Sequence, residues 1–235
     1  SEYFIYQSIR NLILLLNSIN LYLQKFIIIL FFSISFQIFA QEIAVLKYNG
    51  GGDWYANPTA IPNLIEFSNK HTNTLITENP RSIAVGNNDL FNFPIVFMTG
   101  HGNVYFTEKE AKNLRQYLIS GGFLHISDNY GLDKYIRREL KKVFPTIELQ
   151  EIPTNHPIYN QTFLLKKGLP KIHEHNKKAP QGFGLFFEGR LVCFYDYESD
   201  LSDGWEDASI HNNPEEIRLK ALQMGSNIIE YAFKN

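Results

Sequence analysis

Three side chains in this sequence are of types that suit acid–base chemistry. Two of them follow apolar runs, and the third lies in an acidic segment. His101 stands between two glycines shortly after the apolar run Pro94–Met98, and Asp128 follows the run Phe123–Ile126. A histidine and a carboxylate within reach of one another can act as general base and general acid. Asp203, in an acidic segment near the C-terminus, is the third candidate for a catalytic role.

Further polar and aromatic residues accompany these three, and such a mixture is typical of a ligand-binding site. Aromatic faces beside carboxylates suit sugars, because rings offer apolar contact while carboxylates accept hydrogen bonds from hydroxyl groups. The aromatic content of 14% is equally expected of a well-filled core, and that alternative stays open. The residues for which we expect contact with a ligand are Asp53, Trp54, His101, Asp128, Asn129, Tyr130, Tyr197 and Trp205.

Metal binding is indicated only by one pair of histidines. His173 and His175 would point the same way in an extended segment, so that both could reach one ion. A zinc site needs a third protein ligand, and a polar loop is the alternative. The acidic segment 196–207 has the carboxylates that calcium prefers, but it lacks EF-hand spacing. We therefore predict no metal site and leave the cofactor open.

Alternating strand and helix patterns position these residues. Short apolar runs bounded by turn residues predict buried strands, and two runs around Glu188-Gly189 predict a hairpin. The predicted strands cover residues 42–48, 74–76, 94–98, 123–126, 146–152, 183–187 and 191–195. Amphipathic patterns between them predict helices, one of which begins with a capping box of Thr107 and Glu110. This alternation argues for one α/β domain with a mostly parallel central sheet.

The carboxyl ends of parallel strands share one edge of a sheet, and ligands bind there. We therefore expect His101, Asp128 and the acidic segment to face one cleft, with Asp128 at its centre. The alternative for Asp128 is structural, because an aspartate at such a turn often caps the following helix.

The amino-terminal residues differ in composition from the rest. The run 26–39 is apolar, follows Lys25 and precedes the small residue Ala40, which is the arrangement of a secretory signal peptide. A signal-anchor helix through this run and the apolar stretch upstream of it is the alternative. We expect residues 1–24 to be an upstream extension, because the first methionine of the sequence is Met98.

We therefore divide the chain into a signal peptide or signal anchor over 1–41 and one α/β domain over 42–235, and we expect the domain to be exported, periplasmic or membrane-tethered. Basic and acidic side chains number 22 and 24, and this balance does not favour nucleic acid as a partner. The single cysteine, Cys193, excludes an internal disulfide framework and a cysteine-rich metal site. Its neighbours are apolar or aromatic, so we expect it to be buried.

Eight segments within 42–235 occur together in one order. They are KYNGGGDWY, FMTGHGNVYFTEKEA, LRQYLISGGFLHISDNYG, RRELKKVFP, NHPIYN, GLPKIHEH, PQGFG and FYDYESDLSDGWED. In these segments the sequence resembles the bacterial family called domain of unknown function 4159 (DUF4159). The resemblance implies a class I glutamine amidotransferase-like fold, that is, a flavodoxin-like three-layer α/β domain, often exported or membrane-tethered. It implies no particular activity.

The wider superfamily often places a nucleophilic cysteine on the turn after a strand that is similar to Phe123–Ile126. Here Ser127 and Asp128 occupy that turn. A thiolate nucleophile needs an accessible site and an activating base, and Cys193 lies inside a predicted strand instead. We therefore do not expect amidotransferase chemistry.

Two functions agree with these observations. The first is a non-catalytic envelope module that binds a small ligand or an envelope protein at the ends of the strands. The alternative is an Asp/His-based hydrolase, with or without a metal ion, that acts on an envelope or sugar-type substrate. The missing cysteine and the aromatic, acidic candidates favour binding, and whether the protein is an enzyme stays open.

Overall fold

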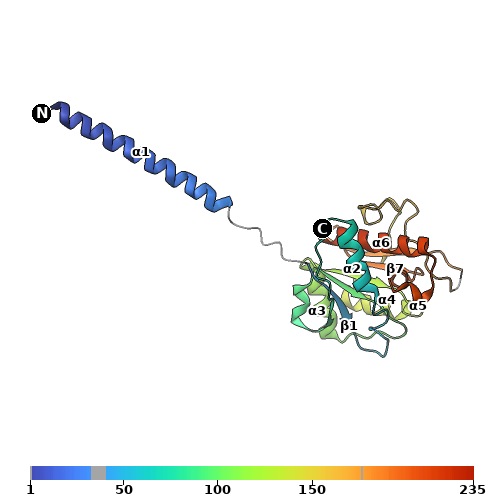
Figure 1. The fold of residues 1–235 in the computed structure, drawn as a ribbon. Coiled ribbons are helices and arrows are strands. Elements are labelled where there is room, and N and C mark those ends of the chain that lie inside the picture. The colour runs from blue at the N-terminus through green and yellow to red at the C-terminus, as the bar shows by residue number, and fades with distance from the viewer. Residues whose placement is uncertain (1, 33–40, 176) are drawn as a thin grey trace. The chain divides into compact units, whose positions relative to one another are not determined.

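The computed structural model describes residues 2–32, 41–175 and 177–235 (Figure 1). They belong to two compact units, Ser1–Phe39 and Ala40–Asn235. In the first unit, helix α1 (Glu2–Phe32) continues from the expected upstream extension into the predicted signal segment. The remainder of that segment, residues 33–40, lies outside the described residues. In the described part of the chain, no helix combines the length and the apolar character that crossing a membrane requires.

The second unit is built on a seven-stranded sheet. Its strands are β1 (Ile43–Lys47), β2 (Arg81–Ala84), β3 (Ile95–Met98), β4 (Phe123–Ser127), β5 (Gln150–Glu151), β6 (Gln181–Phe187) and β7 (Arg190–Tyr197). Their order across the sheet is β2-β1-β3-β4-β7-β6-β5. The first five strands in this order run parallel, whereas β6 is antiparallel to β7 and β5 is antiparallel to β6. The sheet is therefore mixed but mostly parallel, as the sequence predicts.

Helices cover both faces of this sheet and give the domain three layers (Figure 1). On one face α2 packs against α6, and on the other α3 packs against α4. The helices are α2 (Ala60–His71), α3 (Glu108–Ile119), α4 (Asp133–Val143), α5 (Ala208–His211) and α6 (Glu215–Lys234), with the 3-10 helices η1 (Asn88–Asn92), η2 (Pro157–Tyr159) and η3 (Leu201–Gly204). The predicted capping box begins α3, because Thr107 Oγ1 accepts from Glu110 N and the Glu110 carboxylate accepts from Thr107 N.

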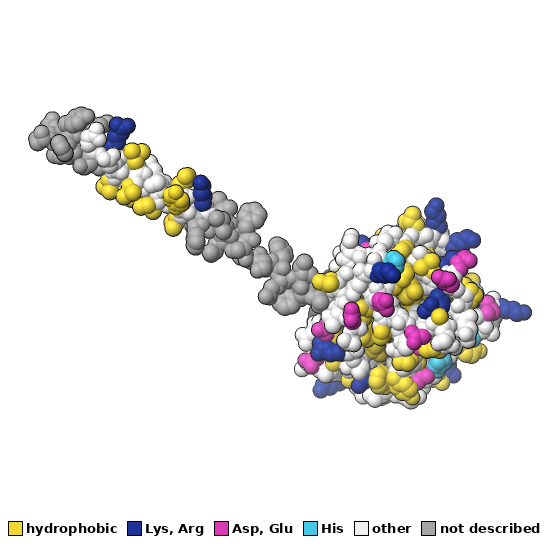
Figure 2. Space-filling view, in the orientation of Figure 1, with side chains coloured by type: hydrophobic (Ala, Val, Ile, Leu, Met, Phe, Trp, Pro, Cys, Tyr) yellow, Lys and Arg dark blue, Asp and Glu magenta, His cyan; other side chains and the backbone are white. Residues whose placement is uncertain are grey.

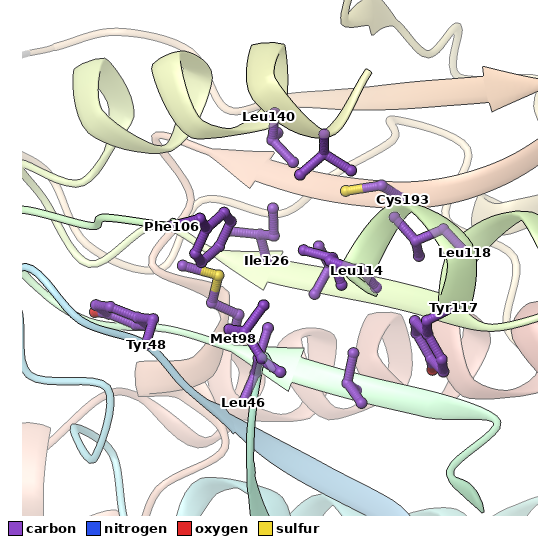
Figure 3. Close-up of a cluster of buried hydrophobic side chains, with 14 of the residues drawn as sticks. Leu46, Tyr48, Met98, Phe106, Leu114, Tyr117, Leu118, Ile126, Leu140 and Cys193 are labelled. Atoms are coloured by element: carbon purple, nitrogen blue, oxygen red, sulfur yellow. The ribbon is translucent and has the colours of Figure 1, made fainter. Parts of the chain in front are cut away.

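Alternate residues of the central strands enter two separate cores. In β3, Val96 and Met98 belong to the core beneath α3 and α4, whereas Ile95 and Phe97 belong to the core beneath α2 and α6. Side chains of a strand alternate between the two faces of the sheet, so burial on both faces requires the continuous apolar runs seen in the sequence. Figure 3 shows part of the first core, in which Cys193 is one of the packed side chains.

Cys193 is buried within β7, as its apolar neighbours predict. Burial raises the pKa of its thiol far above the ordinary value. The sulfur is therefore protonated at neutral pH and shielded from solvent, which excludes it as a nucleophile.

The surface of the second unit carries charges of both signs. On the face seen in Figure 2, lysine and arginine side chains alternate with aspartate and glutamate side chains, without a continuous patch of one sign. This mixture on the visible face agrees with the nearly equal numbers of basic and acidic side chains in the sequence.

Candidate functional site

The candidate residues lie at one edge of the sheet because of the strand directions. Strands β1, β3, β4 and β7 are neighbours and run parallel, so their C-terminal ends meet at the same edge, which we call the carboxyl edge. The segments after these strands carry Asp53, His101, Asp128 and the loop 197–205 in turn. Open α/β sheets bind ligands at this edge.

Asp53 and His101 form a pair at the carboxyl edge. His101 Nδ1 lies 3.0 Å from Asp53 Oδ2, and the backbone N–H of His101 donates a hydrogen bond to Asp53 Oδ1. Burial alone would raise the pKa of Asp53, but the hydrogen bonds from His101 outweigh burial and lower that pKa. Strand β2 lies on one side of β1 and β3 on the other, so the pair marks the point where the winding of the sheet reverses, a preferred position for ligands.

Glycines allow the segments after β1 and β3 to approach closely. Gly100 has a φ of +137°, and a Cβ at this position would lie 2.2 Å from the hydroxyl oxygen of Tyr48. A Cβ at Gly52 would lie 2.7 Å from the carbonyl oxygen of His101. Side chains at these two positions would therefore push apart the segments that hold the Asp53–His101 pair. This close approach explains why glycine occupies both positions.

An open cavity of about 560 Å³ lies between the ends of β3, β4 and β7, and we call it the Asp128 pocket. Its wall includes Gly102, Asp128, Tyr130, Asp133, Tyr197 and Glu198. Three of the predicted residues, Asp128, Tyr130 and Tyr197, therefore line one cavity, and Gly102, the neighbour of His101, lines it too, whereas His101 itself does not.

Asp128 has an unmet acceptor. It is 4% exposed, and its Oδ1 has no hydrogen-bond partner in the described part of the chain. Burial, helped by the negative charges of Asp133 and Asp200, raises the pKa of Asp128 to about 6. The capping alternative is wrong, because the residue that caps α4 is Leu132 and no side chain makes a capping hydrogen bond there.

Tyr130 and Tyr197 bring aromatic rings to the Asp128 pocket. The Tyr130 side chain is exposed and its ring stacks on that of His175, with 4.6 Å between the ring centroids. His175 Nε2 in turn lies 2.5 Å from Asp200 Oδ2, so this contact fixes the ring on which Tyr130 stacks. The hydroxyl of Tyr197 accepts a hydrogen bond from Lys178 Nζ at 3.0 Å.

Asn129 is buried and connects the segment after β4 with η3. Asn129 Nδ2 donates to Asn57 Oδ1 at 3.1 Å, and Asn57 Nδ2 donates to Asp203 Oδ1 at 2.6 Å. Ser202 Oγ donates to Asn129 Oδ1 at 3.3 Å. Asn129 thus positions its neighbours by hydrogen bonds within the protein, and Asn57 is a positioning residue that sequence patterns do not single out.

Asp203 lies in a group of residues that we call the histidine cluster, namely His173, Asp203 and His211. The potential ligand atoms of these three residues all lie within 4.8 Å of one another. His173 Nδ1 is 2.8 Å from Asp203 Oδ2, and His211 Nε2 is 3.9 Å from Asp203 Oδ1. His175, the other histidine of the pair in the sequence, contacts Asp200 through its Nε2 and is not one of the three residues of this cluster. His211 has no local sequence signal, because it reaches the cluster through the fold.

The two tryptophans occupy different environments, and neither lines the Asp128 pocket. Trp205 is buried between Phe97 and His125, and its indole N–H donates to the carbonyl oxygen of Ala221 at 2.8 Å. Its ring therefore belongs to the core and offers no surface to a ligand. Trp54 is half-buried and lines a separate cavity of about 230 Å³ near Arg81.

A serine, a histidine and an aspartate also meet in the interior, next to Asp128. Ser127 Oγ donates to Asp196 Oδ1 at 3.1 Å, and His125 Nε2 lies 2.7 Å from Asp196 Oδ2. In a catalytic triad the histidine lies between the nucleophile and the acid. Here the aspartate is central and all three side chains are buried, so this group is structural.

The family is established by the sequence itself. A profile of the family described as domain of unknown function (DUF4159) matches residues 42–233. The chain belongs to this family, and the match covers the α/β domain almost from β1 to the end of α6. No curated protein matches the chain.

Proposed function

We propose that this protein is a non-catalytic binding module of the cell envelope and that it binds a small sugar-type ligand in the Asp128 pocket. The observation that carries the proposal is the buried Oδ1 of Asp128, which lacks a partner although the residue belongs to the wall of an open cavity. Buried polar groups are almost always hydrogen-bonded, and a hydroxyl or amino group of a ligand supplies the missing donor.

The other groups in the pocket support a sugar over a strongly charged ligand. The wall contains the carboxylates of Asp128, Asp133 and Glu198 together with the ammonium groups of Lys134 and Lys178. Opposite charges in one pocket favour neither a polyanion nor a polycation, whereas hydroxyl groups can donate to carboxylates and accept from ammonium groups. Tyr130 and Tyr197 add aromatic surface for the apolar face of a sugar ring.

The strand order supports the superfamily to which we assign the domain. The order of its parallel strands, β2-β1-β3-β4-β7, is the flavodoxin-like order. In the glutamine amidotransferase-like superfamily the turn after the strand that is similar to β4 often carries a cysteine. Asp128 follows β4 in this chain, which supports binding in place of thiol chemistry at that turn.

The apolar run 26–39 after Lys25 supports export of the domain. Protein recovered from the envelope of the producing cells should have a mature amino terminus near Gln41, as measured by amino-terminal sequencing. Recovery of the intact chain only from the cytosol would contradict export.

One alternative has an observation in its favour. The Asp53–His101 pair resembles a general base oriented by a carboxylate, and the side chain of His101 is 56% exposed. An Asp/His-based hydrolase that acts on a sugar-type substrate would use this pair. In the described part of the chain, however, His101 has no hydrogen bond to a serine or cysteine.

A thermal-shift panel of monosaccharides, amino sugars and short oligosaccharides tests both functions. We expect at least one sugar to raise the melting temperature of the wild type and of Asp89→Asn, an exposed control in η1, but not of Asp128→Asn. Equal stabilisation of Asp128→Asn by that sugar would contradict the site. Turnover of a sugar that is lost in His101→Ala would favour the hydrolase.

A further inference from the structure

We propose that the histidine cluster binds a divalent transition metal ion such as zinc, with His173, Asp203 and His211 as its protein ligands. These residues come from three separate segments: the loop before β6, the 3-10 helix η3 and the short helix α5. Two imidazole nitrogens and one carboxylate oxygen form a ligand set found in zinc and non-haem iron sites. None of the three lines the Asp128 pocket, so this proposal is independent of the proposed function.

The orientation of His173 is the observation that points to a cation. Its Nε2 lies 2.9 Å from Asn213 Oδ1, and an amide oxygen only accepts, so Nε2 carries a proton. Nδ1 faces Asp203 Oδ2 at 2.8 Å. Either a proton, as in an ordinary hydrogen bond, or a metal ion joins these two atoms, and the metal ion is the occupant that we propose. A histidine that binds a metal typically donates its other ring N–H to an oxygen in this way.

Asn213 supplies a second unusual feature of the same cluster. Its Nδ2 is buried and has no hydrogen-bond partner in the described part of the chain. An amide with an unpaired donor is costly, and yet its oxygen is directed at His173. This arrangement is expected of a group whose role is to fix the ring of a ligand.

Metal binding requires the three ligand atoms, which lie within 4.8 Å of one another, to move to a common spacing. Two ligands that are each about 2.0–2.1 Å from a tetrahedral zinc ion lie about 3.3 Å apart. The contact between His173 and Asp203 must therefore lengthen from 2.8 Å, and the contact between His211 and Asp203 must shorten from 3.9 Å. Both histidines lie on partly exposed segments, which can move by such amounts more easily than the core. Glu206 Oε2 lies 2.8 Å from His211 Nε2, and this contact must be released before the same nitrogen can bind the ion.

The carboxylate of Asp203 is already oriented for this role. Its Oδ1 accepts a hydrogen bond from Asn57 Nδ2 at 2.6 Å, and such contacts outside the ligands fix the direction of a metal-binding carboxylate. Asn57 also bonds to Asn129, so an ion in the histidine cluster would stabilise the segments that follow β1 and β4 as well as η3.

The test is a metal titration of the full chain. The protein is stripped with a chelator, Co²⁺ is added at pH 7.5, and the visible absorption of bound cobalt is recorded; Zn²⁺ then displaces it, and elemental analysis gives the stoichiometry. We expect one ion per chain with absorption typical of mixed nitrogen and oxygen ligands, and a higher melting temperature with zinc than without it. Less than one ion per chain under saturating metal overturns the proposal and leaves a proton between His173 and Asp203.

Matched histidine variants locate the ion. His211→Ala removes one ligand from a short, partly exposed helix and should weaken metal binding by about tenfold to a hundredfold or more. His71→Ala, an exposed histidine at the end of α2, is the control and should bind like the wild type. Equal affinities of these two variants overturn the proposal. Circular dichroism tests whether His211→Ala is folded. If it is unfolded, His211→Gln takes its place, and the number of ions bound per wild-type chain still decides whether the metal site exists.

Discussion

His125 Nε2 lies 2.7 Å from Asp196 Oδ2 in the interior of the protein, and this contact joins the neighbouring strands β4 and β7. Burial lowers the pKa of His125 to about 3 and raises the pKa of Asp196 well above its ordinary value. Both directions favour the uncharged forms of the pair. Because the backbone N–H of Asp128 donates to the carbonyl oxygen of Asp196, the pair also holds the residue at the centre of the proposed pocket.

Asp196→Ala should be strongly destabilising. The change leaves His125 Nε2 and Ser127 Oγ buried without the hydrogen-bond partner that they share. A buried polar group without a partner costs about 1–3 kcal/mol, so we expect the free energy of unfolding to fall by about 2–5 kcal/mol. Urea denaturation measures the loss. The exposed control Asp89→Ala should change the same quantity by less than about 0.5 kcal/mol, and an equally small effect of Asp196→Ala would refute a structural role for the pair.

Asp128→Asn should stabilise the protein at neutral pH, although we expect it to abolish ligand binding. Its folded pKa of about 6 lies above the ordinary 3.8, so the folded state holds this proton more tightly than the unfolded state. Stability therefore falls as the pH rises from about 4 to 6, and it stays lower above that window. At pH 7.5 the variant should gain about 2–3 kcal/mol, and the gain should vanish below about pH 4.

Chemical denaturation of wild type and Asp128→Asn at pH 4, 6 and 7.5 measures this difference. Asp89→Asn is again the control, because an exposed carboxylate should give the same difference at each pH. A gain for Asp128→Asn that does not depend on pH would mean that the carboxylate is not held in its uncharged form by burial.

The fold was predictable where local signals are strong. Strands β3 and β4 are buried on both faces and thus appear as short apolar runs, and the capping box marks the start of α3. Strand β2 was not predicted, since only Ile83 of its four residues is buried. An edge strand that pairs only with β1 has little reason to be apolar, so its position depends on the sheet and not on its own sequence.

The candidate site was predictable in position but not in its contacts. Asp128 follows an apolar strand, and the rule for parallel sheets is sufficient to place it at the carboxyl edge. Trp205 stands among acidic residues that suggest an exposed loop, yet its ring fills the core because η3 packs against α6. His211 meets His173 only through the fold, and no sequence spacing links segments whose approach depends on tertiary packing.

The variant Trp205→Phe tests whether Trp205 is a core residue or a ligand contact. The variant loses the hydrogen bond from the indole N–H to Ala221 and part of a buried ring, so we expect a loss of about 1–3 kcal/mol in the free energy of unfolding. Sugar binding should persist, as measured by calorimetry below the melting temperature. Trp54→Phe, at a half-buried position, should be less destabilising. Loss of binding by folded Trp205→Phe would restore the expected ligand role of this residue.

Cys193→Ala tests the claim that the chain uses no thiol chemistry. The sulfur lies in the core among Ile126, Leu140 and other apolar side chains (Figure 3). Its removal leaves a small cavity that should cost about 1 kcal/mol, without effect on sugar or metal binding. A thiol reagent should label the native wild type slowly and label it completely in denaturant, because burial both shields the sulfur and raises its pKa. Cys193→Ala gives the background for this measurement, and rapid, stoichiometric labelling of the native protein that abolishes ligand binding would show that the thiol belongs to a functional site.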